Sequence, residues 1–222
     1  MRAVLFDLDG TLADTDADIR AAWKAALADL NLACPRFDEL FVAGPPLDEM
    51  IRRLFPTEAT PALVEEIRRL FATHYDADGF PNTREYPGVL DIVRDLKARG
   101  DVTAIVTNKR FLGARAMMRH FGWNDCFDRL YAGDMFEATK GRLPKSALLG
   151  LVLDDLHLQR ESCVLVGDTA SDFKAAQANG LSSIAVSWGY GTAAEFALAS
   201  CVVANAAELR NALQLSRKGV AP

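Results

Sequence analysis

Short apolar runs alternate with segments of helical periodicity along most of this chain. Residues 3–6 (AVLF) are apolar at every position, which is typical of a strand buried on both faces of a parallel sheet. Similar short runs recur later, and between them apolar residues return every three or four positions, as on one face of a helix. The pattern predicts a parallel sheet flanked by helices.

The expected elements follow one another in regular order after residue 88. Strands are predicted at residues 3–6, 102–106, 129–132, 162–166, 183–186 and 201–203. Helices are predicted between or after them at residues 90–99, 112–121, 144–153, 173–179 and 208–215. Because strand and helix alternate, we expect right-handed crossovers and an α/β fold with a Rossmann-like parallel core.

No strand pattern appears between about residue 14 and residue 83. Apolar positions in this stretch follow helical spacing, first around residues 19–30 and then at residues 38–41, 47–55 and 61–75. An all-helical stretch inside an α/β chain indicates an inserted subdomain. We therefore expect a core made of residues 1–14 plus 84–222, interrupted by a small α-helical unit at residues 15–83.

Composition and charge exclude several classes of partner. Half of the 222 residues are hydrophobic and the net charge is −5, so the chain can bury a large core but has no excess of basic residues. We expect neither a nucleic-acid partner nor a membrane partner. The absence of a leader pattern and of a span-length apolar stretch, with four widely separated cysteines, predicts a cytoplasmic protein. Oligomeric state has no signature in this sequence.

Candidate chemistry begins directly after the first strand. Asp7 and Asp9 follow residues 3–6, and Gly10 closes a short polar loop. In open α/β sheets, ligands bind beyond the carboxyl ends of the strands. Asp7 and Asp9 can therefore hold a hard cation or attack a substrate there, although Asp-x-Asp-Gly is also a common solvated turn.

Polar side chains also follow two later strands. Thr107 and Asn108 come after residues 102–106, and Asp168 and Asp172 come after residues 162–166. If Asp172 lies one helical turn after Asp168, both carboxylates face the same site. Parallel strands end at one edge of a sheet, so the three groups should meet.

The run FDLDGTLADT at residues 6–15 resembles the first motif of the haloacid dehalogenase-like (HAD) phosphohydrolases. The resemblance implies that Asp7 is a nucleophile that becomes an aspartyl phosphate. It further implies that Asp9 is a general acid and base whose backbone carbonyl reaches Mg²⁺. VTNK at residues 106–109 and SWGYGT at residues 187–192 resemble the phosphoglycolate phosphatase-like branch, in which a small α-helical cap closes over the site.

A magnesium ion is expected because a carboxylate nucleophile and a phosphate dianion repel each other. The expected metal ligands are Asp7, Asp9, Asp168 and Asp172, the last of them directly or through water. Thr107 and Asn108 are expected to bind the substrate phosphate.

The phosphate also requires a cation, for which the sequence offers two lysines. KGRLPKSALL at residues 140–149 resembles a variant of the family's third motif that aligns Lys140 with the catalytic, phosphate-binding lysine. Lys145 falls inside the predicted helix 144–153, where a surface ion pair is the ordinary expectation. Lys140 is therefore favoured, with Lys145 as the alternative.

The expected function is Mg²⁺-dependent hydrolysis of a small phosphorylated metabolite, with 2-phosphoglycolate as the first choice. A nucleoside monophosphate and a sugar phosphate are alternatives within the same chemistry, because a fold and a catalytic set do not determine the substrate. A catalytically silent binding protein is the alternative from another class. Asp9 argues against a dehalogenase, which needs neither an acid at this position nor a metal.

Overall fold

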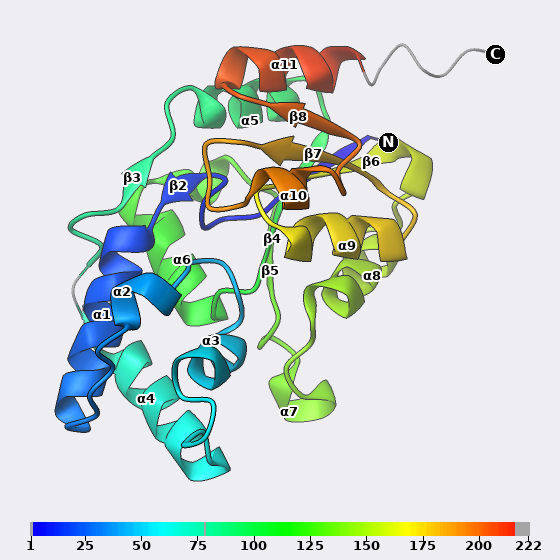
Figure 1. The fold of residues 1–222 in the computed structure, drawn as a ribbon. Coiled ribbons are helices and arrows are strands. Elements are labelled where there is room, and N and C mark those ends of the chain that lie inside the picture. The colour runs from blue at the N-terminus through cyan, green and yellow to red at the C-terminus, as the bar shows by residue number, and fades with distance from the viewer. Residues whose placement is uncertain (1, 78, 216–222) are drawn as a thin grey trace.

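A computed structural model describes residues 2–77 and 79–215 (Figure 1). In this part of the chain six parallel strands form one sheet in the order β5-β4-β1-β6-β7-β8. The strands are β1 (Ala3–Phe6), β4 (Val102–Thr107), β5 (Arg129–Ala132), β6 (Cys163–Gly167), β7 (Ser182–Val186) and β8 (Cys201–Val203). The predicted α/β fold with a parallel Rossmann-like core is confirmed.

Helices cover both faces of the sheet (Figure 1). On one face lie α5 (Val89–Ala98), α6 (Phe111–His120) and α11 (Ala206–Leu215); on the other lie α8 (Lys145–Asp155) and α9 (Ala170–Ala178). Strand β1 serves both cores, since Val4 and Phe6 point into the first while Ala3 and Leu5 point into the second. This alternation follows from the two-residue period of a strand and explains why all four residues are apolar.

Several short elements carry too little periodicity to be predicted. They are the helices α7 (Glu137–Lys140) and α10 (Ala193–Phe196), and the 3₁₀ turns η1 (Trp123–Asp125) and η2 (Arg160–Ser162). Helix α9 begins at Ala170, three residues before the expected start, because Thr169 and Asp172 form a capping box at its N-terminus. None of the helices among the described residues is long and apolar enough to span a membrane.

The segment between β1 and α5 is mainly helical, with α1 (Asp16–Asp29), α2 (Phe37–Leu40), α3 (Leu47–Leu54) and α4 (Pro61–Ala77). These helices gather away from the sheet and share their own hydrophobic cluster around Trp23, Ile51 and Ile67 (Figure 1). We call residues 15–83 the helical insertion and keep the boundaries 1–14 plus 84–222 for the core as a proposal.

The two connections to the helical insertion run side by side. Strands β2 (Ala13–Asp14) and β3 (Arg84–Glu85) pair in an antiparallel ladder too short for a sequence pattern to reveal. Next to this ladder, the buried carboxylate of Asp18 accepts hydrogen bonds from the Thr83 backbone N–H at 2.7 Å and from its hydroxyl at 2.6 Å. Hydrogen bonds from Thr83 in the second connection thus satisfy the charge of Asp18, which follows the first connection, and they hold the two connections together.

The sheet brings three loops to one place. Strand β1 lies between β4 and β6, so the chain order reverses at its carboxyl end. Such a switch point leaves a crevice in which ligands of α/β proteins bind. Asp7, Thr107 and Asp168 each lie at the carboxyl end of one of these three strands.

Candidate active site

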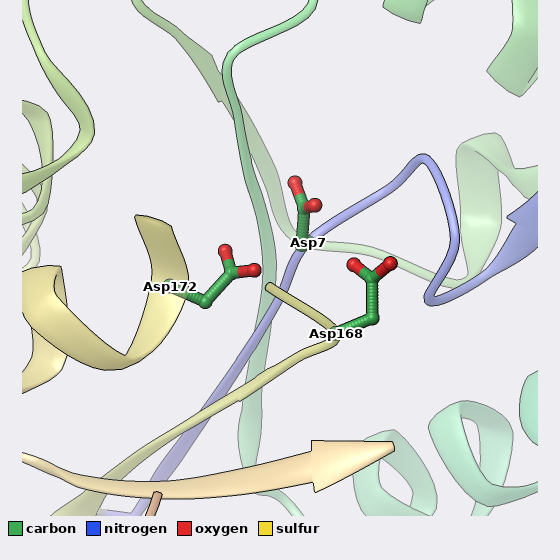
Figure 2. Close-up of side chains that lie close together, drawn as sticks. All are labelled: Asp7, Asp168 and Asp172. Carbon is green, nitrogen blue, oxygen red and sulfur yellow. The ribbon is translucent and has the colours of Figure 1, made fainter. Parts of the chain in front are cut away.

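Three buried carboxylates converge at this switch point. Asp7 follows β1, Asp168 follows β6 and Asp172 lies in the first turn of α9. One carboxylate oxygen of each residue lies within 4.8 Å of those of the other two, as Figure 2 illustrates. Asp168 and Asp172 are 0% exposed, and Asp7 is 8% exposed. The fold therefore brings together acids that are separated by about 160 residues in sequence.

The cation at these acids is Lys145, where the sequence pattern favoured Lys140. The Lys145 ammonium lies 2.7 Å from Asp7 Oδ1 and also donates to Asp172 Oδ1. Lys140 is exposed at the end of α7 and is not brought to Asp7. Pro144 is the N-cap of α8, so Lys145 is its first residue, and the packing of α8 against the sheet leaves the Lys145 side chain buried at the sheet edge, 4% exposed.

The electrostatics of this cluster are unbalanced. Three carboxylates face one ammonium, so the cluster has a net charge of −2 when all four groups are ionised. Burial and the charge of Asp172 raise the pKa of Asp7 to about 7, although Lys145 opposes the shift. Burial, then Asp172, also raises the pKa of Asp168. Burial lowers the pKa of Lys145, but Asp172 and Asp7 outweigh it and raise that pKa.

The donor set fits a divalent cation. Carboxylate oxygens are the ligands that Mg²⁺ takes in proteins, and two excess negative charges match its charge. Asp168 is oriented by the Tyr190 backbone N–H at 2.8 Å and the Thr11 hydroxyl at 3.2 Å. Asp172 is more fully engaged, because its Oδ2 accepts the Thr169 N–H and hydroxyl at 3.0 Å and its Oδ1 accepts from Lys145.

Gly10 is required by the close approach of the first loop to Asp168. Its backbone φ is +80°, and a Cβ at this position would lie 2.1 Å from Asp168 Oδ2. Only glycine meets both demands, the left-handed backbone and the absence of a side chain. The loop that carries Asp7 and Asp9 can therefore lie directly against Asp168.

Thr107 and Asn108 lie at the end of β4, the strand next to the one that precedes Asp7. The buried Thr107 Oγ1 accepts a hydrogen bond from the Lys109 backbone N–H at 3.1 Å, which leaves its hydroxyl hydrogen available. The Asn108 amide donates to Ser171 Oγ at 3.1 Å. Both residues line the same cavity as Asp7.

Asp9 contacts Lys109, a residue to which the sequence analysis assigned no role. Lys109 Nζ lies 2.9 Å from Asp9 Oδ1 and donates to the Tyr75 hydroxyl at 2.7 Å. The next residue, Arg110, pairs with Asp76 at 3.2 Å. Two consecutive residues after β4 thus contact two consecutive residues of α4. The VTNK run contained Lys109, but only the folded chain reveals the contact.

A cavity of about 180 Å³ lies between the sheet edge and the helical insertion. Asp7, Asp9 and Thr107 line its floor, while α1, α3 and α4 contribute the opposite wall. The GPPL run at residues 44–47 also lines this cavity. This loop between α2 and α3 therefore contributes to the wall of the cavity.

Comparison with known proteins gives one family. The model for haloacid dehalogenase-like hydrolases matches residues 4–186. The tyrosine-protein kinase PtkA of Mycobacterium tuberculosis is 33% identical over 95% of this chain and 72% of its own length. A phosphoglycolate phosphatase of Xanthomonas campestris is 34% identical, and a 5'-nucleotidase of Pseudomonas aeruginosa 29% identical, each over 85% of this chain and 84% of the relative.

Solved structures agree with this result. A predicted phosphatase from Clostridium acetobutylicum has the same fold, with a TM-score of 0.86 over 96% of this chain and 98% of that one at 24% identity. CbbY from Rhodobacter sphaeroides, solved in complex with phosphate, has a TM-score of 0.77 at 28% identity, over 94% of this chain and 96% of that one. This chain therefore belongs to the haloacid dehalogenase-like hydrolase family, and phosphoglycolate phosphatases are among its relatives.

Proposed function

We propose that this protein is a Mg²⁺-dependent phosphatase that hydrolyses a small phosphomonoester through an aspartyl phosphate on Asp7. The observation that carries the proposal is the contact of Lys145 with Asp7 beside the carboxylates of Asp168 and Asp172. A nucleophilic carboxylate, a buried cation and a donor set for a divalent ion are the groups that phosphoryl transfer requires. Phosphatases and a phosphate-bound structure among the relatives support the same reading.

The first step forms the covalent intermediate. An Asp7 oxygen attacks phosphorus, the bond between phosphorus and the ester oxygen breaks, and Asp9 donates a proton to the leaving oxygen. Thr107, Asn108 and Lys145 hold the phosphoryl oxygens by hydrogen bonds and charge. A bound Mg²⁺, held by Asp7, Asp168, the Asp9 carbonyl and Asp172 directly or through water, would neutralise charge on the phosphoryl oxygens.

The second step regenerates the enzyme. Asp9 accepts a proton from water as that water attacks phosphorus, the bond to Asp7 breaks, and inorganic phosphate leaves. Residues 15–83 act as the cap in this proposal: they exclude bulk water from the crevice and contact the leaving group. The Lys109–Tyr75 and Arg110–Asp76 contacts support a closed arrangement.

The relatives make a second acceptor worth testing. The mycobacterial relatives named tyrosine-protein kinases match 95% of this chain. Transfer of a phosphoryl group to a tyrosine hydroxyl would use the same carboxylate and cation, with the hydroxyl in place of water. This second candidate predicts labelling of a tyrosine-containing peptide by ATP.

The test measures phosphate release from phosphoglycolate, nucleoside monophosphates, sugar phosphates and pyrophosphate, with Mg²⁺ or with excess chelator. Release that depends on Mg²⁺ and disappears in Asp7→Asn supports the proposal, because an amide is a poor nucleophile. Release in Asp7→Asn, or undiminished release in chelator, contradicts it. A folded protein that neither releases phosphate nor labels peptide indicates a silent binding protein.

A further inference from the structure

The cavity has two chemically different ends. One end contains the polar groups at the strand termini, Asp7, Asp9 and Thr107. A phosphoryl group attacked by Asp7 lies at this end, so the leaving group extends toward the helical insertion. An apolar cavity of about 150 Å³ accepts one benzene-sized ring. The space of about 180 Å³ is therefore of the right order for a phosphoryl group with a ring partly enclosed behind it.

The wall that faces the leaving group is aromatic. Phe71 of α4 is half-buried in this wall, whereas Trp23 of α1 and Phe41 of the α2–α3 loop reach the cavity with only 2% and 3% of their surface exposed. The Trp23 ring centroid lies 6.1 Å from that of Phe41 and 5.7 Å from that of Phe71, with interplanar angles of 66° and 50°. The three rings form one tilted cluster, in which Phe71 offers the largest exposed surface for another flat ring to pack against.

The cations on this wall are already paired with acids. Arg68 lies 2.5 Å from Asp48 and 2.8 Å from Glu65, so two carboxylates surround one guanidinium. Lys109 and Arg110 have their own carboxylate partners, as described above. A carboxylate on the leaving group would be buried here against Asp48 without a spare cation, which is costly. An anionic leaving group such as glycolate therefore fits this wall poorly.

Arg142 lines the other end of the cavity. Its guanidinium donates to the Asn108 carbonyl oxygen at 2.5 Å, beside the residues that face the phosphoryl group. Its positive charge therefore lies near the phosphoryl group and not at the aromatic wall.

We propose that the substrate is a phosphomonoester whose leaving group contains a flat aromatic ring, which packs against Phe71 at the exposed edge of the cluster that this residue forms with Trp23 and Phe41. This inference rests on the proposed phosphatase function and selects among its substrates. Two sources share the chemistry: nucleoside monophosphates, in which a sugar separates ring and phosphate, and esters in which the ring is close to the ester oxygen, as in benzyl phosphate.

The experiment compares kcat/KM within matched pairs. Cytidine 5'-monophosphate is paired with ribose 5-phosphate, and benzyl phosphate with cyclohexylmethyl phosphate, so that each pair has the same kind of primary ester. In one of the two pairs we expect kcat/KM for the aromatic member to exceed that for its partner by roughly tenfold or more. The pair that shows this preference identifies the source of the ring. We expect 2-phosphoglycolate to be a poorer substrate than that aromatic ester.

Two variants test the wall itself. Phe71→Leu should lower kcat/KM for the aromatic member more than for its partner and so reduce the preference within the pair. Phe55→Leu is the matched control, because Phe55 is buried in the same helical insertion but does not line the cavity. Equal rates within both pairs, or phosphoglycolate as the best substrate, would overturn the inference while leaving the phosphatase intact. Failure to hydrolyse any ester would instead contradict the proposed function.

Discussion

Lys145 and Asp7 form an ion pair of 2.7 Å in which the lysine side chain is 2% exposed and the aspartate side chain 11% exposed. Within the described residues this pair links α8 to the loop after β1, which are far apart in sequence. Because Lys145 also donates to Asp172, one ammonium is shared by two of the three clustered carboxylates. The predictions below start from this pair.

We expect Lys145→Met to lower kcat/KM by roughly 10²–10³-fold, as removal of a group that stabilises transition-state charge typically does. It leaves Asp7 and Asp172 without their shared ammonium, so we also expect a lower unfolding temperature. Steady-state kinetics and thermal unfolding measure the two effects. Lys140→Met is the matched control and should resemble the wild type, because Lys140 is exposed. The reverse ranking of the two variants would return the catalytic role to Lys140.

Asp168→Asn should abolish stabilisation by magnesium. A ligand at a hundredfold excess over its Kd stabilises the folded state by about 2.7 kcal/mol. We expect the wild type to show such a gain in thermal unfolding with added Mg²⁺ and to lose it reversibly in chelator. Asp125→Asn, at an exposed carboxylate, is the control and should keep the gain. A full gain in Asp168→Asn would exclude this residue as a metal ligand.

The metal-free protein should be less stable at high pH because of Asp7. Its pKa is 3.8 as an ordinary value and about 7 in the fold, where burial disfavours the charged form. The folded state then binds the proton more tightly than the unfolded state does. The resulting contribution to the free energy of unfolding is complete below pH 3.8 and is lost as the pH rises through about 7.

Denaturant unfolding in excess chelator can isolate this effect. We expect the stability of Asp7→Asn relative to wild type to increase between about pH 5 and about pH 7, by up to about 1.4 kcal/mol per pH unit. A difference that does not vary with pH would mean that the Asp7 pKa is not raised.

Gly10→Ala should destabilise the protein and impair the site together. The backbone at Gly10 has φ +80°, and the added Cβ would overlap Asp168 Oδ2. Gly100→Ala is the matched control, since its φ is +78° and no atom lies within 4 Å of the added Cβ. The control should lose about 1 kcal/mol from backbone strain alone, with its activity retained. Equal effects of the two substitutions on stability and activity would contradict the close approach.

Much of the core was predictable because its signals are local. The run at residues 3–6 is apolar throughout, and in the fold each of its residues is fully buried. The same reasoning predicted β4 and β6, which are also buried along almost their whole length, since burial on both faces favours apolar residues in such a segment. The short ladder between Ala13–Asp14 and Arg84–Glu85 could not be predicted, because two residues have no periodicity and their pairing depends on distant parts of the chain.

The sequence by itself determined the fold class and the polar groups at the strand ends, Asp7, Thr107 and Asp168 among them, because period and strand position are local properties. Only the tertiary structure decided which lysine meets Asp7, since Lys140 and Lys145 are five positions apart and the first turn of α8 directs only Lys145 toward the sheet edge. The contact of Lys109 with Tyr75, and the aromatic wall of the cavity, likewise arise where helices distant in sequence pack together, and no local pattern encodes such packing.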